Sequence, residues 1–249
     1  MAITIKNEKQ IEYMKIAGRI TGETLNLLET KIDVGISTKE LDKIAEDYIR
    51  SKGAVPSFKG YGGFPASICA SVNEEVIHGI PGKKILKNGD IISIDVGAYI
   101  NGFHGDAART FIVGDVSDEA KKLIEVTRQS FFEGIKFAKE GSHLHQISAA
   151  VQEYVESNGF SVVRDYVGHG IGSDMHEAPQ IPNYKTNSRG PRLCKGMTLA
   201  IEPMVNAGDF KVKVLADKWT VVTKDKRLSA HYENTILITD GEPEILTLV

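Results

Sequence analysis

The sequence has few cysteines, no long apolar run and no strong excess of either charge. Its 249 residues include two cysteines, Cys69 and Cys194, too few for a disulfide-rich scaffold or a cysteine-rich zinc site. No apolar run approaches the ~20 residues that a membrane-spanning helix needs. The formal net charge of -3 gives no reason to expect a nucleic-acid partner. The first residues do not resemble a secretion signal, so we expect a cytoplasmic protein with free thiols and no membrane partner.

The composition is that of a globular chain, with 41% hydrophobic and 25% charged residues. The length is sufficient to bury a sizeable core. Apolar residues recur at helical spacing in four segments, 8–30, 38–52, 118–139 and 143–158. Ser37 and Glu40 stand three residues apart, as in a capping box, and Gly53 is placed to end the second helix.

The second pair of predicted helices repeats the pattern of the first. Gly35 is as far from Gly141 as Gly53 is from Gly159, and apolar residues between them match at the same offset. The apolar strands that follow also correspond, and in this repeat Asp95 matches Glu202. Each half therefore reads as helix, helix, strand, and a strand that ends in a carboxylate. We expect one α+β catalytic domain over residues 1–249, with internal halves of about 8–115 and 116–249.

Residues 90–113 have the pattern of a β-hairpin. Asn101-Gly102 is a strong signal for a type I′ turn, because both central residues of that turn need positive φ. With this turn, Gly97 pairs with Asp106. Asp95, two residues before Gly97, then projects from the same face as Asp106.

Two neighbouring carboxylates repel one another and need a shared proton or a cation. A shared proton would indicate an acid protease, but the other polar residues favour a cation. Glu202 corresponds to Asp95 in the second half, Glu233 precedes a β-rich run, and His169 lies between two glycines. Four carboxylates and one imidazole carry too much negative charge for one ion. Two ions about 3.5–4 Å apart, bridged by carboxylates, would balance it.

A set of short motifs, in this order and with these gaps, resembles the type I methionine aminopeptidases, which are M24 metallopeptidases of the pita-bread fold. The resemblance extends from about residue 10 to residue 240. The motifs are His78-Gly79-Ile80-Pro81, Asp95-Val96-Gly97, Gly102-Phe103-His104-Gly105-Asp106, Gly168-His169-Gly170-Ile171-Gly172, His176-Glu177, Ile201-Glu202-Pro203 and Tyr232-Glu233-Asn234-Thr235. The resemblance implies a pseudo-two-fold repeat of helices packed on a curved antiparallel sheet.

The resemblance implies removal of the N-terminal methionine from nascent proteins whose second residue is small. Asp106 and Glu233 would bridge two divalent metal ions, His169 and Glu202 would complete one site, and Asp95 would chelate the other ion. Oxygen-rich ligation with one imidazole suits Co, Mn, Fe or Zn and does not choose among them.

Three residues have catalytic roles by the same resemblance. Glu202 would accept a proton from the attacking water. His176 would stabilise the tetrahedral oxyanion, and His78 would hydrogen-bond near the scissile amide.

The methionine side chain would enter an apolar pocket formed by Phe58, Tyr61, Phe64, Cys69, His78, Met175 and Trp219. Other family members carry different residues at the positions of Phe58, Phe64 and Met175, so the shape of this pocket is open. Cys69 has no base beside it in sequence, and we expect it to form a wall of the pocket and not a nucleophile.

The resemblance also implies partners. The backbone around Asn73, Glu75 and Ser229 matches a family site for a monovalent cation, Na or K. The substrates would be peptide N-termini of nascent proteins, with the ribosome as a further partner, and we expect a monomer.

Other functions on the same fold stay open at this point. An X-Pro aminopeptidase or prolidase shares the fold but carries a further N-terminal domain, for which we see no room. A non-catalytic binding module would be expected to lack one of the five ligands. All five are present in this sequence, which disfavours a binding module. The complete set of ligands also disfavours a metal-free relative of creatinase.

Overall fold

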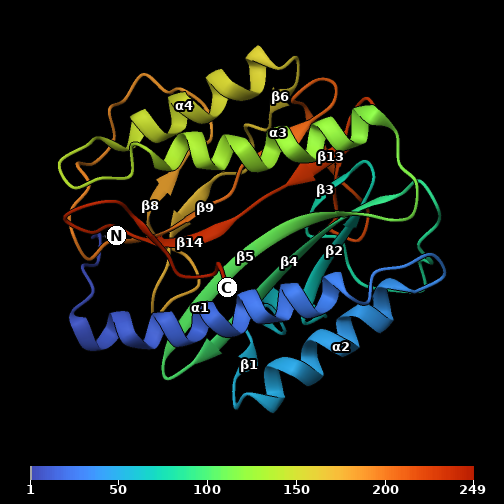
Figure 1. The fold of residues 1–249 in the computed structure, drawn as a ribbon, viewed down its shortest axis with the longest axis horizontal. Helices are drawn as coiled ribbons and strands as arrows, with labels where there is room; N and C mark the ends of the chain where they lie inside the picture. The colour runs from blue at the N-terminus through green and yellow to red at the C-terminus, as the bar shows by residue number, and fades with distance from the viewer. Residues whose placement is uncertain (1) are drawn as a thin grey trace.

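The computed structural model describes residues 2–249, and within them two pairs of helices enclose antiparallel strands (Figure 1). The first pair is α1 (Glu8–Glu29) and α2 (Thr38–Ser51). The second pair is α3 (Asp118–Ile135) and α4 (Leu144–Ser157). Helices combined with antiparallel sheets confirm the predicted α+β class. None of the helices in residues 2–249 has the length and apolar character needed to cross a membrane.

The second helix begins where its capping residues predict. The Ser37 hydroxyl accepts a hydrogen bond from the backbone N–H of Glu40, and the Glu40 carboxylate accepts one from the backbone N–H of Ser37. This reciprocal capping box satisfies two N–H groups that would otherwise lack partners. The third helix ends at Ile135 and not at residue 139. Beyond it, the N–H of Ala138 bonds to the carbonyl of Ile135, so the chain tightens into a turn.

The strands of residues 2–249 form two principal sheets and two small ones. The sheet beside α1 and α2 contains β1 (Val55–Pro56), β4 (Ile91–Ile100), β2 (Ile68–Val72) and β5 (Phe103–Ile112). The sheet beside α3 and α4 has the order β15 (Glu244–Ile245), β14 (Asn234–Leu237), β9 (Thr198–Ile201), β7 (Gly168–Gly170) and β8 (Glu177–Ile181). The small sheets are β13 (Ser229–His231), β10 (Met204–Asn206) and β6 (Ser161–Val162), and β11 (Val212–Val214), β12 (Val221–Thr223) and β3 (Glu75–Ile77).

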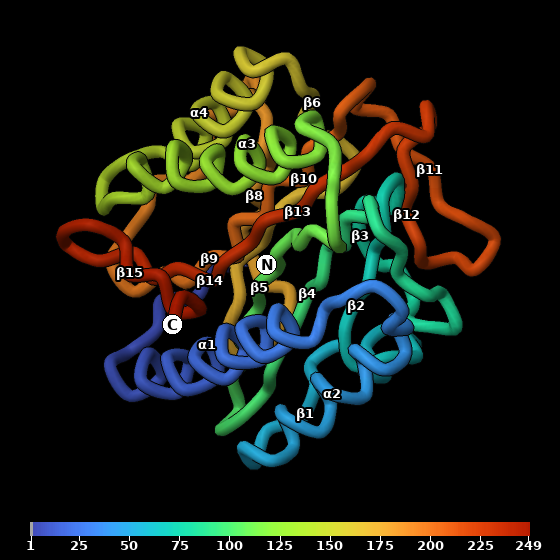
Figure 2. Tube along the Cα trace, turned by 45° about the vertical axis from the view of Figure 1, so that its right-hand side comes forward, coloured from blue at the N-terminus to red at the C-terminus, as the bar shows by residue number. Residues whose placement is uncertain are grey.

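Each helix pair covers one principal sheet, and the two pairs lie on opposite sides of the strands (Figure 2). Leu28 of α1 and Leu41 of α2 pack with Ile94 of β4 in one buried cluster. Phe131 of α3 and Ile147 of α4 pack against β9 and β14 in another. The helix pairs thus shield the outer faces of the sheets.

The hairpin of β4 and β5 has the predicted turn and register. Asn101 and Gly102 have φ of 54° and 85°, Ile100 pairs with Phe103, and Gly97 pairs with Asp106. One expectation was wrong: Asp95 lies in the middle of β4, because this strand continues to Ile100 to complete the hairpin. In the second half the carboxylate does follow the end of its strand, since β9 ends one residue before Glu202.

Close approach of α1 to β5 depends on glycine. A Cβ atom added at Gly105 would lie 2.7 Å from the backbone nitrogen of Gly18. Real Cβ atoms do not come that near to backbone, so a side chain here would push the helix off the sheet. Gly105 thereby sets the distance between α1 and the hairpin that carries Asp106.

Candidate metal centre

Three neighbouring strands of the second sheet bring three of the predicted ligands together. Asn234 pairs with Ile201, so Glu233 and Glu202 lie side by side at the strand ends. His169 pairs with Ala200, two residues before Glu202, and therefore shares its side of the sheet. The local order of β14, β9 and β7 is enough to cluster two carboxylates and one imidazole.

The first half reaches this cluster through β5. The N–H of Glu233 donates to the carbonyl of Ala108 at 2.9 Å, and the N–H of Asp106 donates to the Thr235 hydroxyl at 3.0 Å. These bonds place Asp106 beside Glu233. Asp95 then lies diagonally across the β4–β5 ladder from Asp106.

His169 lies among the carboxylates. Its Nε2 is 3.7 Å from Asp106 Oδ2 and 3.6 Å from Glu202 Oε1, while its Nδ1 is 2.9 Å from the carbonyl of Gly170. A ring nitrogen that donates to a carbonyl leaves the other nitrogen with a free lone pair. This is the usual arrangement of a metal-binding histidine.

Burial makes the cluster unstable without a cation. Asp106, His169 and Glu233 are almost fully buried. Asp95 is partly exposed as a residue, but its Oδ1 atom is buried. Within residues 2–249, Asp95 Oδ1, Asp106 Oδ1 and Glu233 Oε1 have no hydrogen-bond partner. Unpartnered buried carboxylate oxygens are costly, and a divalent cation would satisfy them.

The proton affinities of the cluster lead to the same conclusion. Burial raises the pKa of Asp95 to about 7. Burial, followed by repulsion from neighbouring carboxylates, raises the pKa of Asp106, Glu202 and Glu233 well above the ordinary range. Arg109 offsets part of this charge at Glu233, but the repulsion among the carboxylates remains larger. The donor set of carboxylate oxygens and imidazole nitrogen fits divalent metal ions.

Every residue that the sequence predicts for catalysis, metal binding or the methionine pocket lines one cavity of about 170 Å³. These residues are Phe58, Tyr61, Phe64, Cys69, His78, Asp95, Asp106, His169, Met175, His176, Glu202, Trp219 and Glu233. Gly62 also lines the cavity and was not predicted. No sequence signal indicated it beyond its place between two predicted residues.

One end of the cavity is apolar. Phe58, Phe64, Cys69 and Met175 form one buried cluster against which Trp219 packs. The Phe64 and Trp219 rings meet edge to face, with centroids 5.1 Å apart. Burial raises the pKa of the Cys69 thiol well above its usual value, which leaves it protonated and a weak nucleophile.

Two further histidines lie at the polar end. His78 has a φ of 58°, a conformation that few non-glycine residues adopt and that is enriched at functional sites. Burial lowers the pKa of His78 to about 4 and also lowers that of His176. Tyr61 Oη lies 2.8 Å from His176 Nδ1, so this hydrogen bond orients the ring. Both imidazoles are therefore neutral at pH 7 and available to donate one hydrogen bond each.

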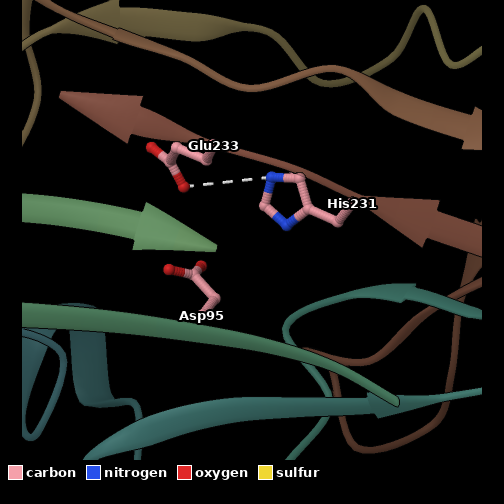
Figure 3. A group of neighbouring side chains, drawn as sticks. All are labelled: Asp95, His231 and Glu233. Atoms are coloured by element: carbon pink, nitrogen blue, oxygen red, sulfur yellow. Dashed lines mark ion pairs between the residues drawn. The ribbon is translucent and has the colours of Figure 1, made fainter. Parts of the chain in front are cut away.

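His231 also belongs to this region, although the sequence alone did not single it out. Its ring faces Asp95 and Glu233 (Figure 3), and its Nε2 lies 3.9 Å from Glu233 Oε2. Its position two residues before Glu233 was the available signal, because side chains two apart in extended chain share a face.

Comparison with known proteins places these residues in a family context. The sequence model of metallopeptidase family M24 matches residues 12–240. The chain is similar to the methionine aminopeptidase of Clostridium acetobutylicum, with 61% identity over 99% of both chains.

Solved structures with the same fold include methionine aminopeptidases and prolidases. The methionine aminopeptidase from Thermotoga maritima superposes with a TM-score of 0.98 and 48% identity, covering 100% of both chains. The prolidase from Pyrococcus furiosus has a TM-score of 0.78 and 24% identity, and the match covers 98% of this chain but 65% of that one. The second likeness concerns the fold alone.

Proposed function

The chain belongs to metallopeptidase family M24, and within it to the methionine aminopeptidases, and on this premise we propose that it removes the N-terminal methionine of proteins at the carboxylate–imidazole cluster. One observation carries the proposal. Carboxylate oxygens of Asp95, Asp106 and Glu233 that are buried and have no partner within residues 2–249 line the same cavity as an apolar pocket. A metal-dependent hydrolase for an apolar terminal residue needs both features side by side.

Five residues would hold two divalent metal ions: Asp95, Asp106, His169, Glu202 and Glu233. Asp106 and Glu233 would bridge the ions, because they lie between Asp95 on one side and His169 on the other. When bound, the ions would supply a water of lowered pKa and polarise the scissile carbonyl. Co, Mn, Fe and Zn all fit this donor set.

The chain's own residues would then move protons and stabilise charge. Glu202 would take the proton of the attacking water. His176, oriented by Tyr61, would donate a hydrogen bond to the oxyanion of the tetrahedral intermediate. His78 would hydrogen-bond near the scissile amide.

Specificity would come from the apolar end of the cavity. Phe58, Phe64, Cys69, Met175 and Trp219 would surround the methionine side chain, with Tyr61 and His78 at the border to the polar end. We also propose the family's requirement for a small second residue, since the chain belongs to that family.

Further parts of the proposal rest on family membership. The chain would act as a single catalytic domain made of two halves, as a cytoplasmic monomer that meets nascent chains near the ribosome. A monovalent cation, Na or K, would bind near Asn73, Glu75 and Ser229. In support, the N–H of Ser229 bonds to the Asn73 carbonyl at 2.9 Å, so these segments are adjacent.

The test is a comparison of three peptides after metal loading: Met-Ala-Ser, Leu-Ala-Ser and Ala-Pro. We expect release of methionine from the first and little product from the others, measured by chromatography. Faster cleavage of Ala-Pro would instead indicate an X-Pro peptidase. Absence of cleavage with any peptide and any of the four metals would favour a binding module.

A further inference from the structure

His231 is a buried residue at the metal centre with no role in the function proposed above. It is 2% exposed, and it ends β13 just before the segment that carries Glu233. Within the described part of the chain, residues 2–249, its Nε2 has no hydrogen-bond partner. A buried, unpartnered imidazole nitrogen is unfavourable. Its ring faces the carboxylates of Asp95 and Glu233, which indicates a role as a ligand of a cation (Figure 3).

The distances from His231 Nε2 to the carboxylates fit binding of a common metal ion and not direct hydrogen bonds. His231 Nε2 lies 3.8 Å from Glu202 Oε2 and 3.9 Å from Glu233 Oε2, too far for hydrogen bonds. Two donor atoms that each lie ~2.0–2.2 Å from one ion can be up to ~4.2 Å apart. His169 stands at similar distances, 3.6 and 3.7 Å, from its own carboxylate neighbours.

Two groups of three donors emerge from this geometry. Atoms of Asp106, His169 and Glu233 lie within 4.8 Å of one another, and so do atoms of Asp95, His231 and Glu233. Glu233 is common to both groups, as expected for a bridging ligand. Each group thus contains one imidazole, one further carboxylate and the Glu233 carboxylate.

We propose that His231 Nε2 is a ligand of the metal ion held by Asp95 and Glu233, so that each of the two ions has one imidazole ligand. The inference rests on the proposed function, because it adds a ligand to the same centre. An imidazole in an otherwise all-oxygen site makes that site more selective for Mn, Fe, Co or Zn over Mg and Ca.

The test uses the full chain loaded with Co(II). Proton NMR counts the hyperfine-shifted, exchangeable N–H signals of metal-bound imidazoles, and calorimetry measures the two binding steps. We expect two N–H signals for the wild type and one for His231→Gln. One binding step should weaken by at least ~10-fold, the lower limit for losing even an outer partner of a metal site. His145→Gln, on α4 outside the cluster, is the matched control and should change neither readout.

The outcomes are distinguishable. Two shifted signals in His231→Gln would overturn ligation even if the affinity fell, because His231 would then act only as a neighbour. A single signal in fully loaded wild type would also overturn it, and this reading does not depend on the variant folding. Failure of the wild type to bind cobalt at all would refute the proposed function itself.

A second feature, the ion pair between Lys6 and Glu177, concerns His176. Lys6 Nζ lies 2.6 Å from Glu177 Oε2, and the two side chains are 4% and 7% exposed. The Thr4 hydroxyl donates to the same oxygen, and the N–H of Asp174 donates to Oε1. The N-terminal segment is therefore tied to the residue that follows His176.

The pair closes the loop that carries two cavity residues. Residues 171–176 connect β7 to β8 and contain Met175 and His176. Gly172 in this loop packs so closely on the pair that a Cβ atom there would overlap Glu177 Oε1 and lie 2.8 Å from Lys6 Nζ. The N–H of His104 also bonds to the Gly172 carbonyl at 2.9 Å. The loop is held at both ends, so its backbone fixes the position of His176.

We infer that Lys6 and Glu177 are positioning residues that set the place of the His176 ring. Removing one partner would strand a buried charge and destabilise the fold. The informative variant is therefore the double substitution Lys6→Met/Glu177→Leu, which replaces the pair by apolar groups. A purely structural pair would allow both stability and activity to recover in this variant.

We expect the double variant to keep the melting temperature of the wild type. Its KM for Met-Ala-Ser should stay within about threefold of the wild-type value, while its kcat falls at least tenfold. In a His176→Ala background, the same double substitution should have no further effect on kcat, because both changes remove one interaction. Replacing the exposed pair Lys195–Asp240 by Met and Leu is the control and should leave kcat unchanged. Wild-type kcat in the double variant, or additive losses with His176→Ala, would contradict the inference. An inactive wild type would refute the proposed function instead.

Discussion

Replacing Asp106 by asparagine should stabilise the metal-free protein and abolish its stabilisation by metal. Asp106 is 3% exposed, and its Oδ1 has no hydrogen-bond partner within residues 2–249. Burial and the neighbouring Glu233 and Asp95 raise its pKa well above the ordinary value. A carboxyl group whose pKa is higher in the folded state takes up a proton on folding, so the folded state loses stability as the pH rises above the unfolded pKa of ~3.9.

The size of the effect can be bounded. Keeping a carboxyl fully protonated in the folded state at pH 7 costs about 4 kcal/mol, because pH 7 lies roughly three units above the unfolded pKa of ~3.9 and each unit is worth ~1.36 kcal/mol. This cost is lower when a proton is shared with Glu233 and when water reaches the site. We therefore expect Asp106→Asn to raise the free energy of unfolding of the metal-free protein by about 1–2 kcal/mol. With ~2.1 cal/mol/K of unfolding entropy per residue, Asp106→Asn should melt roughly 2–4 °C higher than the metal-free wild type at pH 7. The gain should vanish near pH 3, where the carboxyl is protonated in both states.

Bound metal should make the wild type melt higher than Asp106→Asn. At about 100 times Kd, a bound ion stabilises the wild type by ~2.7 kcal/mol, or roughly 5 °C for a chain of this length. The variant should shift by less than about 1 °C. Calorimetric scans with chelator and with metal measure both quantities, with Asp240→Asn as an exposed control. A metal-free variant that melts lower than the wild type at pH 7, or one that keeps the metal-induced shift, would refute the reasoning.

Three further outcomes follow from the site and its supports. Glu202→Gln should lower kcat at least ~100-fold while circular dichroism stays unchanged, as expected on losing a general base; retained turnover would remove Glu202 from that role. Trp219→Ala should raise KM for Met-Ala-Ser about tenfold through lost apolar contact, with kcat nearly constant, and an unchanged KM would exclude Trp219 from the pocket. A hydrogen bond from Lys59 lowers the pKa of Glu46 to about 2, so its stabilisation is present above the unfolded pKa and lost as the pH falls toward 2. Because Lys59 is largely exposed, Glu46→Gln should cost only ~0.5–1 kcal/mol at pH 7 and nothing near pH 2 by calorimetry; an equal loss at both pH values would point to a different cause.

Local chemistry was sufficient to predict the helices and the hairpin. The Ser37 capping box and the Asn101-Gly102 turn are interactions between residues close in sequence, so their geometry follows from the residues themselves. The register that this turn imposes places Asp95 and Asp106 on one face of the hairpin, as the sequence predicts. The position of Asp95 within β4 was predicted wrongly, because the repeat was matched by its carboxylates and not by its strand ends.

Contacts between distant segments were beyond the same reasoning. The meeting of His169, Glu202 and Glu233 depends on the pairing of β7, β9 and β14, which no local pattern encodes. Family motifs indicated these residues, but the bonds from Ala108 and Asp106 to the 233–235 segment explain how the two halves meet. His231 was overlooked because its position two residues before Glu233 indicates a shared face but no role, and the role emerges only from its buried Nε2, which has no partner within residues 2–249.

The most direct test of the metal centre measures metal content and activity on the same samples. After dialysis against chelator, the chain is titrated with Co, Mn, Fe or Zn, and bound metal per chain is measured beside methionine release from Met-Ala-Ser. We predict that activity is lost on metal removal, returns with added metal, and reaches its maximum with no more than two ions bound per chain. Full activity in samples from which all metal has been removed would contradict the account.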